Sequence, residues 1–231
     1  MFILNFMSNF YIVASPIGNL KDISLRAIET LKDVDLVLCE DTRVTRKLLD
    51  FYEIKKPTQS YHKHSKLSKV DHIIDLLREG KNLALVSDAG TPTISDPGSF
   101  LISEIIKNLG DDVSIISIPG ASAVISALTI SGFNADRFKF IGFPPHKKGR
   151  KTFFENIEAE KDLVVFYESK HRIEKALQSL SEVLEGREIV LCRELTKVFE
   201  TIYRGTANQV LEELKNDKIL GEFVVVVSPK K

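Results

Sequence analysis

Residues 86–98 read Val-Ser-Asp-Ala-Gly-Thr-Pro-Thr-Ile-Ser-Asp-Pro-Gly, and this stretch decides how the first half of the chain folds. It follows an apolar run at 83–86, typical of a buried strand, and precedes a helical pattern at 99–108. In α/β sheets, ligands bind at the carboxyl ends of the strands. Two prolines and two glycines fix the loop backbone and let it approach a ligand without intervening side chains. We interpret the stretch as a ligand-binding loop; an elaborate turn is the alternative.

Strands and helices alternate on both sides of this loop. Ser24 can cap a helix that carries Leu25, Ile28 and Leu31 on one face, and Thr42 can cap the next helix. A third helix carries Val70, Ile73, Ile74 and Leu77, with Gly80 placed to end it. The predicted strands are 11–14, 36–39, 58–61, 83–86 and 113–118. This alternation predicts a mostly parallel sheet covered on both faces.

Pro119-Gly120 breaks the alternation, and we place a domain boundary there. The expected domains are an N-terminal α/β domain, 1–118, and a C-terminal α/β domain, 119–231. The small apolar run at 121–131 predicts a buried helix, and Thr206 with Gln209 forms a capping box for the last helix. Predicted strands lie at 138–143, 163–167, 188–193, 199–203 and 223–227. Because no helix separates the strands near 190 and 200, the second sheet is expected to be mixed.

Composition limits the classes of function. The chain has 231 residues, and its 32 basic residues balance its 32 acidic ones, so any affinity for RNA must come from local basic clusters. No apolar run is long enough to span a bilayer, which favours a cytoplasmic protein. Cys39 and Cys192 both end apolar runs and are interpreted as buried, reduced thiols.

Two further loops are expected at the same edge of the first sheet. Ser-Pro-Ile-Gly-Asn-Leu, 15–20, follows the first strand, and Pro-Gly-Ala-Ser-Ala, 119–123, follows the fifth. The sequence contains neither G-x-G-x-x-G nor G-x-x-x-x-G-K-[ST], so the ligand does not need the usual phosphate cradle. We predict no metal site, because His62 and His64 have no carboxylate or thiol partners nearby.

Charged clusters also follow strands. Glu-Asp-Thr-Arg, 40–43, fits either a capped helix start or a functional site. Tyr-Glu-Ser-Lys-His-Arg, 167–172, and Arg-Glu-Leu-Thr-Lys, 193–197, fit either a site or a surface charge cluster. The basic loop Lys-Lys-Gly-Arg-Lys, 147–151, suits contact with phosphates, although many such loops are only solvated. A looser basic stretch contains Lys55, Lys56, Lys63, Lys66 and Lys69.

These motifs, in this order, resemble the tetrapyrrole-methylase superfamily and, within it, the family of 16S ribosomal RNA cytidine 2′-O-methyltransferases. The resemblance runs from Tyr11 to Val227. The sequence differs from the family pattern at Ser15, where Thr is usual. Many members of the family also continue past the last strand with a helical segment. It implies two α/β domains with S-adenosylmethionine held in a cleft between them. The cofactor-binding residues that it implies are Pro16, Ile17, Gly90, Thr91, Pro92, Ile94, Ser122, Ala123, Tyr167 and Leu195.

The resemblance also implies the substrate, the small ribosomal subunit with its 16S RNA, and a homodimer, with no role for a membrane or DNA. A ribose hydroxyl is a poor nucleophile, so a base or a cation that lowers its pKa would help. The charged candidates for catalysis are Arg43, Glu168, Arg172, Glu194 and Lys197, and no single base is assigned. The candidate RNA contacts are Lys147, Lys148, Arg150 and Lys151. A tetrapyrrole methyltransferase and a non-catalytic RNA-binding assembly factor are the alternatives.

Overall fold

The structure is a computed structural model that describes residues 8–62, 67–96 and 98–230. The sequence predictions that involve residues 1–7, Lys63, His64, Lys66 and Pro97 lie outside these ranges. The chain divides into two compact units, Met1–Ser122 and Ala123–Lys231. The expected domain boundary at 118/119 lies a few residues before this division.

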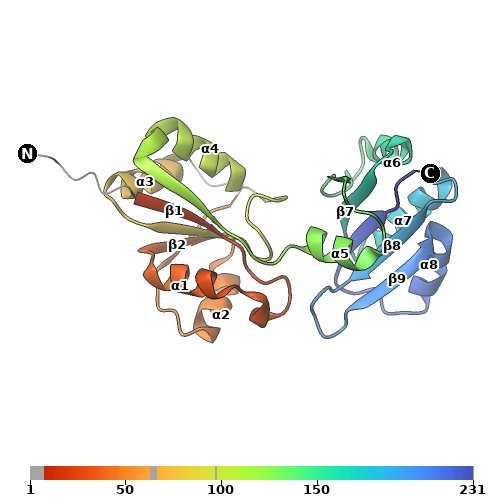
Figure 1. The fold of residues 1–231 in the computed structure, drawn as a ribbon, viewed down its shortest axis with the longest axis horizontal. Coiled ribbons are helices and arrows are strands. Elements are labelled where there is room, and N and C mark those ends of the chain that lie inside the picture. The colour runs from red at the N-terminus through yellow and green to blue at the C-terminus, as the bar shows by residue number, and fades with distance from the viewer. Residues whose placement is uncertain (1–7, 63–66, 97, 231) are drawn as a thin grey trace, which may run out of the picture. The chain divides into compact units, whose positions relative to one another are not determined.

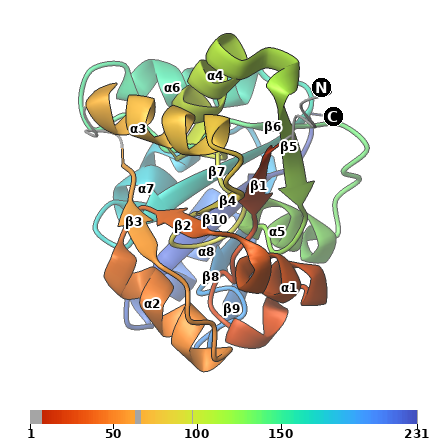
Figure 2. The ribbon, with the colours of Figure 1, turned by 90° about the vertical axis from the view of Figure 1, so that its left-hand side faces the viewer.

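The first unit is built around a five-stranded parallel sheet, so the predicted mostly parallel sheet is confirmed. Figure 2 shows its strand order, β3-β2-β4-β1-β5, and all its strand pairs are parallel. The strands are β1 (Ser8–Val13), β2 (Leu36–Cys39), β3 (Thr58–Ser60), β4 (Leu83–Val86) and β5 (Val113–Ile118). The helices are α1 (Leu25–Asp33), α2 (Thr42–Phe51), α3 (Leu67–Arg78) and α4 (Gly98–Leu109), with short 3-10 turns η1 (Leu20–Asp22) and η2 (Gly110–Asp112).

Helices cover both faces of this sheet, as Figure 1 shows. On one face, Ile73 of α3 and Ile105 of α4 belong to the same buried cluster as Phe10 of β1. On the other face, Leu31 of α1 and Leu49 of α2 are buried together with Val37 and neighbouring strand residues. Burial on both faces explains why the strands are apolar throughout.

The second unit contains a mixed sheet of order β6-β7-β10-β8-β9, which confirms the prediction for this half of the chain. Only the β6–β7 pair is parallel. Its elements are α5 (Ala123–Ser131), β6 (Phe138–Phe140), α6 (Arg150–Ala159), β7 (Leu163–Ser169), α7 (Ile173–Val183), β8 (Glu188–Arg193), β9 (Thr201–Thr206), α8 (Ala207–Lys215) and β10 (Glu222–Val227).

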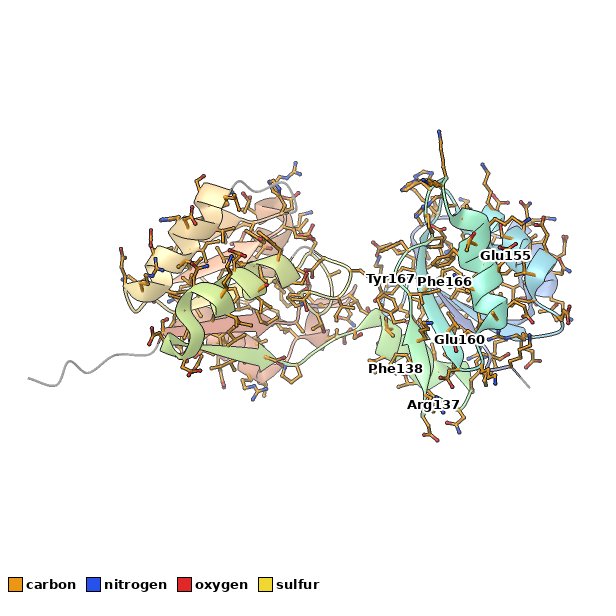
Figure 3. All side chains as sticks on the ribbon, turned by 90° about the horizontal axis from the view of Figure 1, so that it is seen from above. Arg137, Phe138, Glu155, Glu160, Phe166 and Tyr167 are labelled. Carbon is orange, nitrogen blue, oxygen red and sulfur yellow. The ribbon has the colours of Figure 1, made fainter. Side chains whose placement is uncertain are left out.

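The two faces of the second sheet have different coverings. Helices α6, α7 and α8 contribute Phe154, Leu177 and Val210 to the main core, together with Phe166 of β7. Tyr167, the next residue along β7, points to the opposite face because side chains alternate along a strand (Figure 3). On that face its side chain hydrogen-bonds to the backbone of Val124 in α5.

Two of the three predicted N-terminal helix caps are confirmed. The Ser24 hydroxyl accepts a hydrogen bond from Ala27 N, and Thr206 forms a reciprocal capping box with Gln209. The Thr42 prediction is wrong, because Asp41 caps α2 and Thr42 is its first helical residue. A carboxylate accepts the same amide hydrogen bond and also carries a charge that the positive end of the helix dipole stabilises.

Three other local predictions need correction. Leu25, the first residue of α1, is 78% exposed and does not share the buried face of the helix with Leu31. Helix α5 is not fully buried: Ile125 is 50% exposed. The expected strand at 199–203 begins only at Thr201, because a turn stabilised by the hydrogen bond from Thr196 N to Glu200 Oε2 occupies the preceding residues.

Both cysteines are free and buried, as the sequence suggested. Burial raises the pKa of the Cys192 thiol to about 12, so this thiol stays protonated near neutral pH. None of the helices in the described ranges combines the length and the apolar character needed to cross a membrane.

Candidate functional site

The loop after β1 and the loop after β4 are joined by backbone hydrogen bonds. Ser15 N donates to Gly90 O at 2.9 Å, and Gly90 N donates to Ser15 O at 3.1 Å. The buried Ser15 hydroxyl donates to Ser87 O at 3.0 Å, and the Ser87 hydroxyl donates to Gly90 O at 2.9 Å. The Ser15 hydroxyl therefore links the loop after β1 to the loop after β4.

The loop after β5 joins the same group. The Thr91 hydroxyl donates to Ala121 O at 3.2 Å. Gly120 packs so closely on Ala14 that an added Cβ would lie 2.9 Å from the Ala14 Cβ, which is closer than such atoms approach in proteins. Gly90 has φ +79°, a conformation that glycine adopts without strain. The structure therefore brings the three predicted loops together at the carboxyl ends of β1, β4 and β5.

The implied cofactor-binding residues of the first unit occupy different environments in these loops. Pro16, Ile17, Gly90 and Pro92 are buried and shape the loop backbone. Thr91 and Ser122 are half-buried, and Ile94 is 48% exposed. Thr91, Ser122 and Ile94 are consequently the side chains with accessible surface.

Backbone strain concentrates in two of the sequence motifs. Five described residues other than glycine have positive φ, and four of them are Thr93, Ser95, Glu194 and Thr196. The first two lie in the 86–98 stretch, where Asp96 accepts hydrogen bonds from Thr93 N at 2.6 Å and from Gly98 N at 2.7 Å. The other two lie in the 193–197 motif. Such conformations persist where the surrounding structure fixes them, and they are concentrated at functional sites.

Arg43 lies at the surface of the first unit, outside the joined loops. Its guanidinium is 2.6 Å from the Asp41 carboxylate, and its side chain is 87% exposed. Hydrogen bonding to Arg43 lowers the pKa of Asp41 to about 2. The nearby Glu40 carboxyl has a raised pKa, first because burial desolvates it and then because Asp88 and Asp96 add negative charge. The 40–43 motif thus combines a capped helix start with a partly desolvated carboxylate.

In the second unit, Lys197 is held between two carboxylates. Its ammonium lies 2.8 Å from Glu194 Oε1 and 3.0 Å from Glu222 Oε2. Desolvation lowers the pKa of Lys197, but the hydrogen bonds to Glu194 and Glu222 outweigh this effect, and the net pKa is raised. Desolvation likewise opposes ionisation of Glu194, but its hydrogen bonds to Lys197 and to Glu222 N give it a lowered pKa. The site therefore presents a fixed, protonated ammonium.

Sequence reasoning missed Glu222 and Gly221 as members of this group. These residues come together because β8 and β10 pair in antiparallel orientation. Phe223 is paired with Arg193, and this register brings Glu222 beside Glu194. Glu194 N donates to Glu222 O at 3.0 Å, and Glu222 N donates to Glu194 Oε1 at 2.9 Å. Strand partners cannot be assigned from local sequence patterns, so this arrangement was not predictable.

Gly221 provides the space that the Glu194 carboxylate occupies. It has φ +90°, and an added Cβ would overlap the Glu194 side chain. We expect Gly221→Ala to lower the free energy of unfolding by about 2–4 kcal/mol, from backbone strain plus overpacking. We also expect activity to fall, because Glu194 no longer holds Lys197. Urea denaturation and an activity assay measure the two effects.

Gly186→Ala is the matched control. Gly186 has φ +73°, with no atoms within 4 Å of the position that a Cβ would take. It should show only the backbone strain, roughly 1–2 kcal/mol. Equal losses of stability in the two variants would contradict the packing of Gly221 on Glu194.

Glu168 and Arg172 form an ion pair with each other, whereas Lys197 pairs with Glu194 and Glu222. Glu168 is 1% exposed, and its Oε1 lies 2.9 Å from Arg172 Nη2. Arg150 Nη1 lies 3.6 Å from Glu168 Oε2. The basic residues of the 147–151 motif therefore differ in exposure. Lys147, Lys148 and Lys151 are exposed, whereas Arg150, the first residue of α6, points inward toward Glu168.

Three of the implied cofactor contacts belong to the second unit: Ala123, at the start of α5, and Tyr167 are half-buried, and Leu195 is buried. Tyr167 lies between Phe140 and Phe143, with ring centroids 4.9 and 5.3 Å away. Burial raises the pKa of Tyr167, which keeps its hydroxyl protonated. Leu195 is 7% exposed in the strained turn after β8.

The fold and these loops define a class. Residues 9–211 match the family of tetrapyrrole (corrin/porphyrin) methylases. A solved diphthine synthase has the same fold with a TM-score of 0.73 and 16% identity, over 96% of this chain and 90% of that one. A cobalt precorrin-4 methyltransferase gives a TM-score of 0.70 at 17% identity, over 96% and 95% of the two chains.

Relatives in sequence narrow the class. The ribosomal RNA small subunit methyltransferase I of Haemophilus influenzae is 47% identical, over 95% of this chain and 78% of that protein. Proteins of the same name from Bacillus subtilis and Thermotoga maritima are 46% and 42% identical, over 96% and 97% of this chain and 75% and 100% of their own lengths. The chain belongs to the ribosomal RNA small subunit methyltransferase I family and is a methyltransferase.

Proposed function

We propose that this chain transfers a methyl group from S-adenosylmethionine to the ribose 2′-hydroxyl of a cytidine in 16S RNA of the small ribosomal subunit. The observation that carries the proposal is identity of 42–47% over nearly the whole chain to proteins named for small-subunit ribosomal RNA methylation. Transfer of a labelled methyl group from S-adenosylmethionine to small ribosomal subunits tests it. Labelling of a tetrapyrrole instead of RNA would support the alternative and exclude this proposal.

The three joined loops fit a cofactor that needs no phosphate cradle. A Cβ at Gly120 would overlap Ala14, and a side chain at Gly90 would be strained by its φ of +79°. The surrounding residues offer backbone amides, carbonyls and short side chains. We assign binding to Pro16, Ile17, Gly90, Thr91, Pro92, Ile94 and Ser122 of the first unit, with Ala123, Tyr167 and Leu195 of the second unit. Within the described ranges, no group of three or more His, Cys, Asp or Glu residues could hold a metal ion.

S-adenosylmethionine, when bound, supplies an electrophilic methyl group on a sulfonium. In the transfer, the bond between the methyl carbon and sulfur breaks as a bond to the ribose oxygen forms, and the hydroxyl proton passes to water. The chain must hold the hydroxyl in line and lower its pKa. Lys197 is the candidate for the second task, because Glu194 and Glu222 keep it protonated and fixed. A fixed cation stabilises the negative charge that develops on the attacking oxygen.

RNA binding is assigned to the exposed lysines of the basic motif. We expect the triple variant Lys147→Gln, Lys148→Gln and Lys151→Gln to bind small subunits more weakly, with cofactor affinity nearly unchanged. Phosphate contacts act through counterion release, so the slope of log affinity against log salt should flatten by about 0.7–0.9 for each phosphate that the variant no longer neutralises. Titration at several salt concentrations measures the slope.

The control carries the same change in net charge on the first unit, at exposed Lys32, Lys81 and Lys107, each replaced by Gln. Arg150 is kept in both variants because its guanidinium lies against Glu168. If the slope of log affinity against log salt is equal for wild type and the 147/148/151 variant, these three lysines do not contact the RNA phosphates.

The family resemblance also leads us to propose that the enzyme is a homodimer. Sedimentation equilibrium of the purified chain tests this proposal, and a monomeric mass at micromolar concentration would contradict it.

A further inference from the structure

A buried carboxylate in the second unit lies between two arginines. Glu168, near the end of β7, has a side chain with no exposed surface, and Arg150 and Arg172 each expose only 18% of theirs. Arg172 Nη2 pairs with one carboxylate oxygen at 2.9 Å, and Arg150 Nη1 approaches the other at 3.6 Å. Arg150 also lies over the Phe154 ring, with its guanidinium carbon 5.1 Å from the ring centroid. A single carboxylate thus pairs with two arginines, one at the start of α6 and one at the N-cap of α7.

Both arginines also hold the chain segment that carries two of the lysines proposed to bind RNA, Lys147 and Lys148. Arg172 Nη1 donates to Pro144 O at 3.1 Å, and Arg150 Nη1 donates to Pro145 O at 3.4 Å. These carbonyls belong to residues 143–149, here called the 143–149 loop, which links the end of the β6 segment to α6. Gly149 precedes α6 with φ +84° and no side-chain cap. Among the described residues, the two arginines supply the side-chain hydrogen bonds to this loop.

The geometry is poorly suited to a catalytic role for Glu168. Its Oε1 accepts a hydrogen bond from Ser169 N at 2.8 Å and forms an ion pair with Arg172 Nη2 at 2.9 Å, so this oxygen is already occupied. Its Oε2 is buried and makes no hydrogen bond within the described part of the chain. A general base must reach the proton that it removes, directly or through one water molecule. A carboxylate buried under two arginines instead favours a role in fixing those arginines.

We propose that Glu168 is a positioning residue: acting through Arg150 and Arg172, it holds the 143–149 loop, which carries Lys147 and Lys148 and leads into Lys151 of α6, so that these lysines are presented to RNA. The inference rests on the proposed RNA-binding function of these lysines. Without the carboxylate, the two guanidinium groups repel each other and the loop is no longer held. The loop must then be ordered again at each binding event, which weakens RNA binding more than it slows the chemical step.

Glu168→Gln tests the inference with two independent measurements. Limited trypsin digestion after Lys147 and Lys148 reports loop order directly, and cleavage should accelerate about tenfold because it follows local opening. In steady-state assays, KM for small subunits should rise about tenfold, while kcat at saturating RNA falls less than about threefold. Arg172→Lys, which keeps the charge but removes the planar fork, should shift both measurements in the same direction by less.

Glu160→Gln is the control, since the half-buried Glu160 carboxylate pairs with the exposed Lys139 in the same unit, and it should leave both measurements unchanged. A fall in kcat of about 100-fold or more with unchanged KM and unchanged cleavage would identify Glu168 as a catalytic base and overturn the inference. Loss of cofactor binding together with faster cleavage would also overturn it, by showing that Glu168 supports the whole unit. If wild type fails to bind RNA, the proposed function fails, but the digestion still decides whether Glu168 orders the loop.

Discussion

Thr91→Arg is expected to lower the affinity for S-adenosylmethionine by at least about 100-fold, or about 2.7 kcal/mol, without unfolding the protein. Thr91 lies where the loops after β4 and β5 meet, and its hydroxyl donates to Ala121 O. The side chain is only half-buried, so an arginine there extends into the space assigned to the cofactor rather than into the core. Isothermal calorimetry with a chelator present measures cofactor affinity and excludes a metal contribution.

Two companion variants separate steric exclusion from loop loosening. Thr91→Val removes only the hydrogen bond, worth about 1 kcal/mol, so affinity should fall less than about tenfold. Thr129→Arg places the same side chain on the exposed surface of α5 and should bind normally. If Thr91→Arg binds the cofactor like wild type while melting normally, the three loops are not the cofactor site.

Lys197→Met is expected to lower kcat by about 100-fold or more while leaving cofactor affinity within about threefold. The variant removes the ammonium that Glu194 and Glu222 hold, and it leaves the apolar stem of the side chain in place. Lys197→Arg keeps a positive charge and should recover part of the lost rate. Lys139→Met, at an exposed ion pair of the same unit, is the matched control. Single-turnover methyl transfer at saturating RNA and cofactor isolates the chemical step.

The pH dependence distinguishes a cation from a base at position 197. The pKa of Lys197 in the folded protein is raised, so its ion pairs contribute stability that is complete below the unfolded-state pKa of about 10.4. This stability is lost as pH rises through the folded-state pKa. A cationic role predicts that Lys197 adds no inflection to the rate below about pH 10 and that activity falls above it. A rate that instead rises as Lys197 deprotonates would contradict the cationic role.

Local patterns predicted most of the fold, because each unit buries its apolar residues in the periodicity that strands and helices impose. The 83–86 run became β4, and Val70, Ile73, Ile74 and Leu77 became the buried face of α3, as expected. The gathering of the three loops followed from one rule, that parallel strands end at the same edge of a sheet. Thr42 failed as a cap because two adjacent residues could fill that role and only the backbone conformation decides between them.

The environment of charged residues was much less predictable. The sequence grouped Arg43, Glu168, Arg172, Glu194 and Lys197 as one class, yet the structure places them in three settings: an exposed ion pair, a buried arginine–carboxylate group and a strained turn. Arg150 was grouped with its lysine neighbours but lies on the inner side of the α6 start. Such differences depend on which strands pair, and antiparallel pairing of β8 with β10 brings together residues that are far apart in sequence.

Ribose methylation of 16S RNA is the most direct test of the central claim. Small subunits isolated from cells that lack the gene are incubated with the purified chain and S-adenosylmethionine, and 2′-O-methyl groups are mapped by their protection of the adjacent phosphodiester from alkaline hydrolysis. We predict new protection at a cytidine of 16S RNA, absent when Thr91→Arg replaces the wild-type chain. Cofactor binding without any gain of ribose methylation on the small subunit, or methylation on a base instead of a ribose, would contradict the account.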